Sequence, residues 1–424
     1  MKPNLLKVLF IIEQCNPEWA SVPLVGYNFY RGIRKRADVT LVTHIRNKAA
    51  LEKVRNGHRI CYIEESHRIR RYYRLVSKLT TRGGVNWPLQ HALSYPIYAE
   101  FNNRVFRKFK ARVLNQEFDL VHALTPMLPR YPYKIINACK NTPFLLGPVN
   151  GGVPFPDGFK EVAKMEFAHF NFLRIFTRML PGYAKTYKTA DRVLSGSTYT
   201  LNMLKNMFNL KADRIELFYE NGIEKDFIQK PRQIAKESLD LLFVGRLVPY
   251  KGADMVIEAL GRLPDAVLKH IRLTIVGDGS ERNALERQTL KLGLNDHIRF
   301  TGWIEQKETA DFYKNSDLFC FPSVREFGGA VALEAMACGL PCIVADHAGI
   351  GEYVTSETGF KIKPESKEFV IQKLSEKIQI LFNDDPLRLK MAKKAVERAM
   401  EFEWERKAEK MTELYDSIVT VKRV

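Results

Sequence analysis

Two glutamates eight positions apart, Glu326 and Glu334, enclose a Phe-Gly-Gly sequence within PSVREFGGAVALE at residues 322–334. The residues that follow, AMACGLP at 335–341, favour a helix that ends at a Gly/Pro stop. Glu326 is therefore predicted in the loop before a helix, and Glu334 in its second turn. The amides between them would lie at the positive end of the helix dipole, which binds anions. Such a cradle suits a nucleotide-sugar, with phosphates on the amides and hydroxyl groups on the acids.

Two alternatives compete for the glutamate pair. The first is glycoside hydrolysis, for which paired acids lie about 5–9.5 Å apart. Eight residues of helix would separate the two acids by about 12 Å, so the spacing disfavours hydrolysis. The second is an ordinary Gly-rich helix entrance with two solvated glutamates, and the neighbouring motifs bear on that choice.

A second group of polar residues follows the apolar run at 241–244, where Gly245, Arg246 and Lys251 come in close succession. Ligands of open α/β sheets gather beyond the carboxyl ends of the strands, so these cations are placed for a diphosphate. Arginine offers a fork of donors and lysine a point charge, and both bind phosphate. The alternative is ordinary surface charge on a loop. Three more apolar runs end in comparable loops: GDG at 277–279, TGWI at 301–304 and HAGIGE at 347–352.

The elements that position these loops are short apolar runs separated by longer amphipathic segments. Such runs are typical of parallel strands covered on both faces. We expect strands at residues 7–12, 39–43, 120–123, 144–146, 192–194, 241–244, 273–276, 298–300, 318–321 and 342–345. The fold class is therefore α/β, with two doubly wound Rossmann-like domains. Expected boundaries are 1–220 and 221–402, separated by the polar stretch 221–240. A helix at 403–424 has apolar residues at helical spacing. It is expected to cross back to the first domain, and the alternative is that it caps the second.

Composition is that of a globular protein, 46% hydrophobic and 27% charged. No apolar run reaches the length of about 18 residues that a spanning helix needs. The start, MKPNLLKVLFII, is interpreted as a first strand rather than a signal peptide, because Lys7 interrupts it and no cleavage site follows. The six cysteines form no metal-type spacing, which favours buried thiols in a reducing cytoplasm.

Charge is unevenly distributed. Residues 1–220 carry 35 Lys and Arg against 16 Asp and Glu, whereas residues 221–424 carry 31 against 32. Basic amphipathic segments at 67–82 and 101–110 suggest peripheral attachment to an anionic membrane surface. The alternative is two core-facing helices with a solvated basic side. Nucleic acid is not expected as a partner, because no recognised binding module accompanies the charge.

Taken together, five motifs resemble the retaining glycosyltransferases of family 4, which have the two-domain GT-B fold. They are VGRLVPYKG at 244–252, VGDG at 276–279, FTGWI at 300–304, PSVREFGGAVALEAMACGLPCIVAD at 322–346 and AGIGE at 348–352. These motifs span the predicted second domain. In that fold the two domains face each other across a cleft. One departure is that Phe327-Gly328-Gly329-Ala330 replaces the usual Gly-Phe-Gly-Leu, which bears on sugar selectivity.

The resemblance implies a role for each matching residue. Arg246 and Lys251 would neutralise the diphosphate, beside Gly245. Glu326 would contact the hydroxyl groups of the donor sugar together with the amides of Phe327, Gly328 and Gly329. Glu334 would hold the ribose diol, and the base would lie near Trp303 and Ile304. Catalysis would then rest on Arg246, Lys251 and Glu326.

On the acceptor side the resemblance is less extensive. DLVH at 119–122 resembles the family's strand that ends in a histidine at the cleft, although Leu124 replaces the second histidine that many members have. The loop LGPVNGGVPFPD at 146–157 would face the acceptor through Asn150, Gly151 and Gly152. A strand-capping role for His122 and a simple turn at 150–152 are the alternatives.

The resemblance implies transfer of a sugar from a nucleoside diphosphate to a hydroxyl group of a carbohydrate or lipid-linked acceptor, with retention at the anomeric carbon. Cations replace a metal in this scheme, so no metal or other cofactor is expected. A cytoplasmic enzyme of cell-surface polysaccharide or glycolipid synthesis, peripheral at the inner membrane face, is the resulting expectation. Alternatives are a nucleotide-sugar epimerase or phosphorylase on the same architecture, and a non-catalytic nucleotide-sugar-binding subunit.

Overall fold

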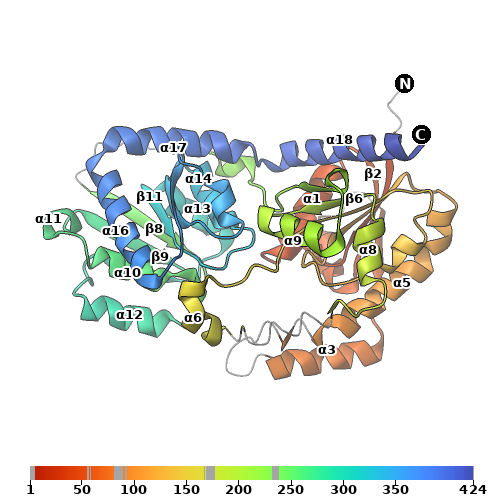
Figure 1. The fold of residues 1–424 in the computed structure, drawn as a ribbon, viewed down its shortest axis with the longest axis horizontal. Coiled ribbons are helices and arrows are strands. Elements are labelled where there is room, and N and C mark those ends of the chain that lie inside the picture. Colours follow the sequence, from red (N-terminus) through yellow and green to blue (C-terminus); the bar gives the residue numbers. More distant parts are fainter. Residues whose placement is uncertain are drawn as a thin grey trace. The chain divides into compact units, whose positions relative to one another are not determined.

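The computed structural model describes residues 5–54, 57, 59–80, 89–90, 93–166, 168, 177–231 and 238–423. The chain divides into two units, each built around its own sheet (Figure 1). The first unit comprises Met1–Gly152, Phe167–Glu220 and Trp404–Val424, and the second comprises Val153–Glu166 and Asn221–Glu403. Val153–Glu166 thus groups with the second unit, although it lies inside the first predicted domain.

The sheet of the first unit has seven parallel strands in the order β3-β2-β1-β4-β5-β6-β7. The strand order reverses between β1 and β4, which is the mark of a doubly wound sheet. The strands are β1 Lys7–Ile12, β2 Asp38–His44, β3 Arg59–Ile63, β4 Leu120–Thr125, β5 Phe144–Val149, β6 Arg192–Ser195 and β7 Ile215–Leu217.

Alternate residues of β1 belong to two separate cores. Leu9 and Ile11 pack in a cluster with Phe101 and Phe109, whereas Phe10 packs in a second cluster on the other face. Because side chains alternate across a strand, the apolar run of β1 fills both cores. Helices of this unit are α1 Val22–Ile33, α2 Lys48–Lys53, α3 His67–Thr80, α5 Tyr95–Leu114, α8 Tyr183–Thr189, α9 Thr198–Phe208 and α18 Trp404–Arg423.

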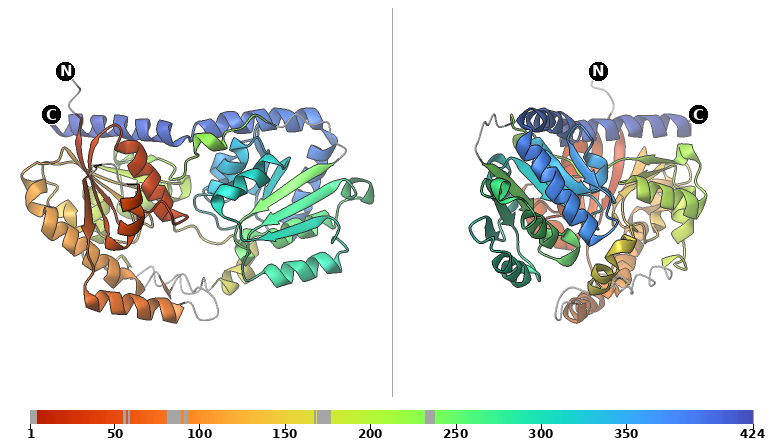
Figure 2. Two further views of the ribbon diagram at one scale, coloured as in Figure 1. Left: turned by 180° about the vertical axis from the view of Figure 1, so that it is seen from behind. Right: turned by 60° about the vertical axis from the view of Figure 1, so that its left-hand side comes forward.

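In the second unit six parallel strands follow the order β10-β9-β8-β11-β12-β13, with the reversal between β8 and β11. The strands are β8 Leu239–Val244, β9 Ile271–Val276, β10 Ile298–Gly302, β11 Leu318–Phe321, β12 Cys342–Ala345 and β13 Gly359–Ile362. Helices cover both faces of the sheet (Figure 2). They are α6 Lys160–Met165, α10 Ala253–Leu260, α11 Asp265–Leu268, α12 Arg282–Lys291, α13 Gln306–Lys314, α14 Ala330–Ala337, α15 Ile350–Tyr353, α16 Lys367–Asn383 and α17 Asp385–Met400.

Single turns of 3-10 helix complete the described secondary structure, at Ile45–Asn47, Lys134–Asn137, Asp157–Phe159, Ala212–Arg214, Lys225–Phe227 and Pro249–Lys251. All ten predicted strands are present, and the doubly wound α/β class is confirmed. The strands that the sequence did not predict, β3, β7 and β13, each lie at the edge of a sheet. No helix among the described residues is long and apolar enough to cross a membrane.

The C-terminal helix α18 returns to the first unit, as predicted, and packs on α1. Its apolar face enters the core through Met411, Tyr415 and Ile418. Gly32 of α1 makes the close approach possible, because a side-chain carbon there would lie 2.7 Å from Cβ of Ala408. Outside the core, Glu405 accepts a 2.8 Å hydrogen bond from Arg36.

Replacing Met411 by Ala is predicted to destabilise the first unit, because Met411 is fully buried in this core. Truncations of this kind cost about 2–5 kcal/mol. The measurement is the midpoint of urea unfolding, followed by circular dichroism. Val421 of the same helix is 76% exposed, so Val421→Ala is the matched control and should leave the midpoint in place. Equal midpoints for the two variants would contradict the assignment of α18 to this core.

Candidate functional site

The motif residues of the second unit gather where its strand order reverses. β8 ends at Val244 and is followed by Gly245 and Arg246, while β11 ends at Phe321 and leads to Glu326. The two strands are parallel neighbours, so their carboxyl ends lie at the same sheet edge. A crevice outside the carboxyl ends at such a reversal is the usual ligand position in open α/β sheets.

Lys251 and Glu326 form an ion pair across this reversal, between Nζ and Oε2. Their side chains are only 13% and 19% exposed, so the pair is screened less than a surface pair would be. The Lys251 ammonium also lies 5.1 Å from the ring centroid of Phe321, the last residue of β11. The structure therefore brings together two of the three predicted catalytic residues.

The third predicted catalytic residue, Arg246, is exposed and begins the same loop as Lys251. Its Nη2 donates a 2.8 Å hydrogen bond to the hydroxyl group of Tyr250. Tyr250 and Lys251 both belong to the 3-10 turn Pro249–Lys251. One short turn thus fixes the position of both predicted diphosphate-binding cations.

Glu334 lies inside α14, as predicted, and is only 8% exposed. Its Oε2 accepts a 2.9 Å hydrogen bond from the hydroxyl group of Tyr313. Tyr313 is fully buried, and this burial, together with the neighbouring carboxylate, raises its pKa well above the usual value. The phenol therefore stays protonated and donates to Glu334, which fixes the position of that carboxylate.

The Gly-rich entrance of α14 packs against a second loop. Gly329 has φ of 59°, a left-handed conformation that glycine adopts without strain. The backbone amide of Gly349 donates a 3.2 Å hydrogen bond to the carbonyl of Glu326. A side chain at Gly349 would collide with the carbonyl oxygen of Phe327. Residues 326–329 and the loop before α15 are thus held as one backbone assembly.

Trp303 and Ile304 lie after β10, at the edge of the sheet. Trp303 is 72% exposed. Because β9 separates β10 from β8, these residues lie on the flank of the site and not beside Lys251. The structure therefore does not bring them together with the cations.

The predicted acceptor residue His122 is fully buried in β4. Its Nδ1 is 2.6 Å from the hydroxyl group of Tyr415, and its Nε2 is 2.6 Å from the carbonyl oxygen of Gly147. Burial lowers the pKa of His122 to about 4. Since both ring nitrogens have partners in the core, His122 connects β4, β5 and α18, which fits the structural alternative. Its acceptor-side role stays a prediction.

Asn150 is also buried, at 4% exposure. Its Nδ2 donates hydrogen bonds of 2.7 and 2.9 Å to the two carboxylate oxygens of Glu220. The amide of Gly151 donates a 3.0 Å hydrogen bond to Oγ1 of Thr200, at the start of α9. A side-chain carbon at Gly152 would lie 2.6 Å from Sδ of Met203. Asn150 therefore anchors this loop internally, and its predicted role on the acceptor side stays a prediction.

Arg325 was missed by the sequence interpretation. It precedes Glu326, and its guanidinium carbon lies 4.8 Å from the ring centroid of Phe155 and 5.8 Å from that of Phe327. Tyr250 was also missed. The only signal in the sequence was the adjacency of Arg325 to Glu326, because Phe155 is distant along the chain.

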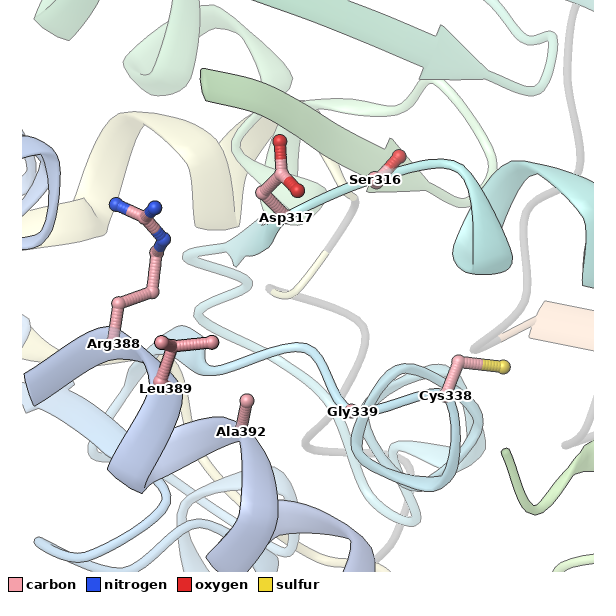
Figure 3. Close-up of a pocket in the computed structure, with 7 residues that line it drawn as sticks. All are labelled: Ser316, Asp317, Cys338, Gly339, Arg388, Leu389 and Ala392. Carbon is pink, nitrogen blue, oxygen red and sulfur yellow. The ribbon is translucent and has the colours of Figure 1, made fainter. Parts of the chain in front are cut away.

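A shallow pocket in the second unit lies at the opposite ends of the strands (Figure 3). Asp317, which lines it, precedes β11 and accepts a 2.9 Å hydrogen bond from the amide of Asp240. Arg388, on the facing helix α17, donates a 2.7 Å hydrogen bond to the carbonyl of Leu381. These polar groups are used in holding the unit together, so the pocket is not the candidate site.

Comparison with solved structures identifies the fold. The structure of Anabaena Alr3699/HepE in complex with UDP aligns with a TM-score of 0.63 and 17% identity, over 97% of this chain and all of that chain. WaaG, a glycosyltransferase involved in lipopolysaccharide biosynthesis, aligns with a TM-score of 0.58 and 19% identity, over 96% of this chain and 99% of that one. With its two doubly wound units, the protein has the GT-B fold.

Residues 224–398, which lie in the second unit, match the family described as glycosyl transferases group 1. A D-inositol 3-phosphate glycosyltransferase of Kribbella flavida is 27% identical over 244 residues, 53% of this chain and 56% of that protein. The corresponding enzyme of Corynebacterium glutamicum is 32% identical over 191 residues, 43% of this chain and 44% of that protein. The chain thus spans about half the length of these curated relatives.

The buried His122 predicts a specific acid sensitivity. In the unfolded chain His122 becomes protonated below its usual pKa of 6.5. In the folded protein it stays neutral until the pH approaches its lowered pKa of about 4. Stability is therefore fully present above pH 6.5 and falls as the pH drops toward 4, by about 3 kcal/mol at most. Thermal unfolding midpoints measured from pH 8 to pH 4 should show this loss.

His122→Gln should unfold at a lower temperature at pH 8, because its packing and hydrogen bonds change. Its further loss between pH 6.5 and pH 4 should be smaller than that of the wild type. His44, whose pKa burial also lowers to about 4, is unchanged in both proteins and cancels in the comparison. Identical slopes with pH would contradict a neutral, buried His122.

Proposed function

We propose that the protein transfers a sugar from a nucleoside-diphosphate sugar to an acceptor hydroxyl group, with retention at the anomeric carbon. The observation that carries this proposal is the Lys251–Glu326 ion pair at the strand reversal of the second unit. It joins a cation suited to phosphate and a carboxylate suited to sugar hydroxyl groups in one partly buried position. The match of residues 224–398 to the family described as glycosyl transferases group 1 supports the same reaction class.

The leaving diphosphate gains negative charge as the anomeric bond breaks. Arg246 and Lys251 stabilise that charge in the transition state more than in the ground state, and this difference accelerates the reaction. Before a donor binds, Lys251 is paired with Glu326. Donor binding therefore exchanges that ion pair for a phosphate contact and leaves the Glu326 carboxylate to accept hydrogen bonds from the sugar. The departing phosphate accepts the proton of the acceptor hydroxyl.

The donor that we propose is a UDP-sugar. Support comes from the structurally similar Alr3699/HepE, which was solved with UDP and also with UDP-glucose. The acceptor that we propose is a carbohydrate or lipid-linked sugar in cell-surface polysaccharide or glycolipid synthesis, for which the similarity to WaaG is the support.

Two other functions remain distinguishable by experiment. An epimerase or phosphorylase would convert the nucleotide-sugar without an added acceptor, whereas a transferase releases UDP in proportion to acceptor. A non-catalytic subunit would bind the donor without releasing UDP at all. Measuring both UDP release and conversion of the UDP-sugar, with and without a cell-surface glycan extract, therefore separates the three.

Lys251→Ala is predicted to lower kcat by about 10²- to 10³-fold, the loss typical of removing one transition-state donor. UDP release measures this change directly. Lys269 offers a matched control, because it is exposed and precedes β9 at the opposite sheet edge. Lys269→Ala should retain wild-type activity, and an equal loss in both variants would refute a specific role for Lys251.

We further propose that α3 attaches the protein to an anionic membrane surface. Leu75 and Leu79, four positions apart, are each 54% exposed, and Arg71, Arg74 and Lys78 are exposed beside them. Exposed leucines among basic residues suit the membrane interface. Arg82, at the end of the predicted segment, lies outside the described residues. The second predicted segment differs, because Phe101, Val105 and Phe109 of α5 are core residues.

Arg71→Gln with Arg74→Gln is predicted to weaken binding to vesicles of phosphatidylglycerol by about 30-fold, at about 1 kcal/mol per basic residue. Co-sedimentation at low salt measures the affinity, and vesicles of phosphatidylcholine should bind neither protein. Lys390 and Lys393 are exposed on α17 of the second unit. Their replacement by Gln serves as the charge-matched control, and equal weakening by both pairs would exclude a dedicated surface on α3.

A further inference from the structure

Arg325 is held in an enclosed position beside the proposed donor site. Its guanidinium carbon lies 4.8 Å from the ring centroid of Phe155 and 5.8 Å from that of Phe327. The Nε atom is buried and has no hydrogen-bond partner among the described residues. A buried donor of a charged group without a partner is unfavourable, so such groups in native proteins call for an explanation.

Arg325 interacts electrostatically with Tyr250 and with Glu166. Burial lowers the pKa of Arg325, while Tyr250 and Glu166 raise it. The same Glu166 is influenced by both Arg325 and Arg246, although burial raises the pKa of its own carboxyl. Arg246 in turn donates to Tyr250. Arg325 therefore shares its electrostatic environment with the cation that the family resemblance assigns to the diphosphate.

The segment Val153–Glu166 encloses this arginine from one side. Phe155 supplies the ring, and the neighbouring carbonyl of Pro154 accepts a 2.9 Å hydrogen bond from Nε2 of His347. Farther along, Gly158 lies so close to the carbonyl of Glu365 that any side chain there would collide with it. Helix α6 (Figure 1) then packs on the turn Pro249–Lys251. The segment is thus fixed to the second unit at several points, close to Lys251.

We propose that Arg325 is a third oxyanion-binding cation of the donor site, and that Phe155 is the residue that positions it. The inference rests on the proposed function and adds a residue and a segment to it. The ligand is an oxyanion carried by the donor. It is either an oxygen of the diphosphate or the carboxylate of an acidic sugar, because a guanidinium fork binds both.

The test compares the wild type with Arg325→Met and Arg325→Lys by isothermal titration calorimetry. The probes are pyrophosphate, UDP, UDP-glucose and UDP-glucuronate. If the partner is the diphosphate, Arg325→Met should bind all four about 10- to 100-fold more weakly, with part of the affinity kept in Arg325→Lys. If the partner is the sugar carboxylate, only the binding of UDP-glucuronate should weaken by that factor. Either pattern supports the inference.

Arg299 provides the matched control, since it is exposed on β10 of the same unit. Arg299→Met should bind every probe as the wild type does. Melting temperatures of the ligand-free variants establish that each is folded. Wild-type affinities for all four probes in a folded Arg325→Met would overturn the inference and leave the proposed function standing. A wild type that binds none of the probes would overturn both together.

A double-mutant cycle tests Phe155 as a positioning residue. In the wild-type background, Phe155→Leu should weaken the binding of those probes that Arg325→Met also weakens. In the Arg325→Met background it should cause no further loss of affinity. A merely structural contribution of Phe155 would lower affinity equally in both backgrounds. That additive result would overturn the positioning role.

Discussion

The reversal of strand order between β8 and β11 is the constraint on which the candidate site depends. Neighbouring parallel strands whose crossovers run in opposite directions leave their two following loops beside each other, with no helix between them. Lys251 follows one of these strands and Glu326 follows the other, which is why residues 75 positions apart meet as an ion pair. The topology of the sheet therefore brings residues of two separate motifs into contact.

Glycine is what allows the loops around that pair to approach so closely. The assembly of residues 326–329 with the loop before α15 leaves no room for a side chain at Gly349. In the same way, a side chain at Gly277 would collide with the carbonyl of Gly245. Backbone therefore packs on backbone at these two strand ends, where a residue with a side chain would not fit. These contacts explain why the motifs contain glycine at fixed positions.

Much of this arrangement could be predicted from the sequence, for physical reasons that differ between elements. The central strands are continuous apolar runs because both of their faces are buried, and β11 and β12 were predicted to the residue. Edge strands such as β3, with only one flank paired and a partly exposed surface, lack that signal. His122 and Asn150 illustrate a different limit. The sequence does not distinguish a polar residue that faces a ligand from one that makes hydrogen bonds inside the core. Here both residues make buried hydrogen bonds.

Sequence patterns could not predict that Val153–Glu166 belongs to the second unit, because its composition does not indicate which residues it contacts, Arg325 among them. Its placement also has a consequence for how the chain is assembled. The polypeptide passes between the units four times instead of twice, so separating them would take four cleavages instead of two. A recombinant fragment that begins at Asn221 would lack Phe155 and α6. During translation, this stretch leaves the ribosome before the rest of the second unit, so its contacts with that unit form only later.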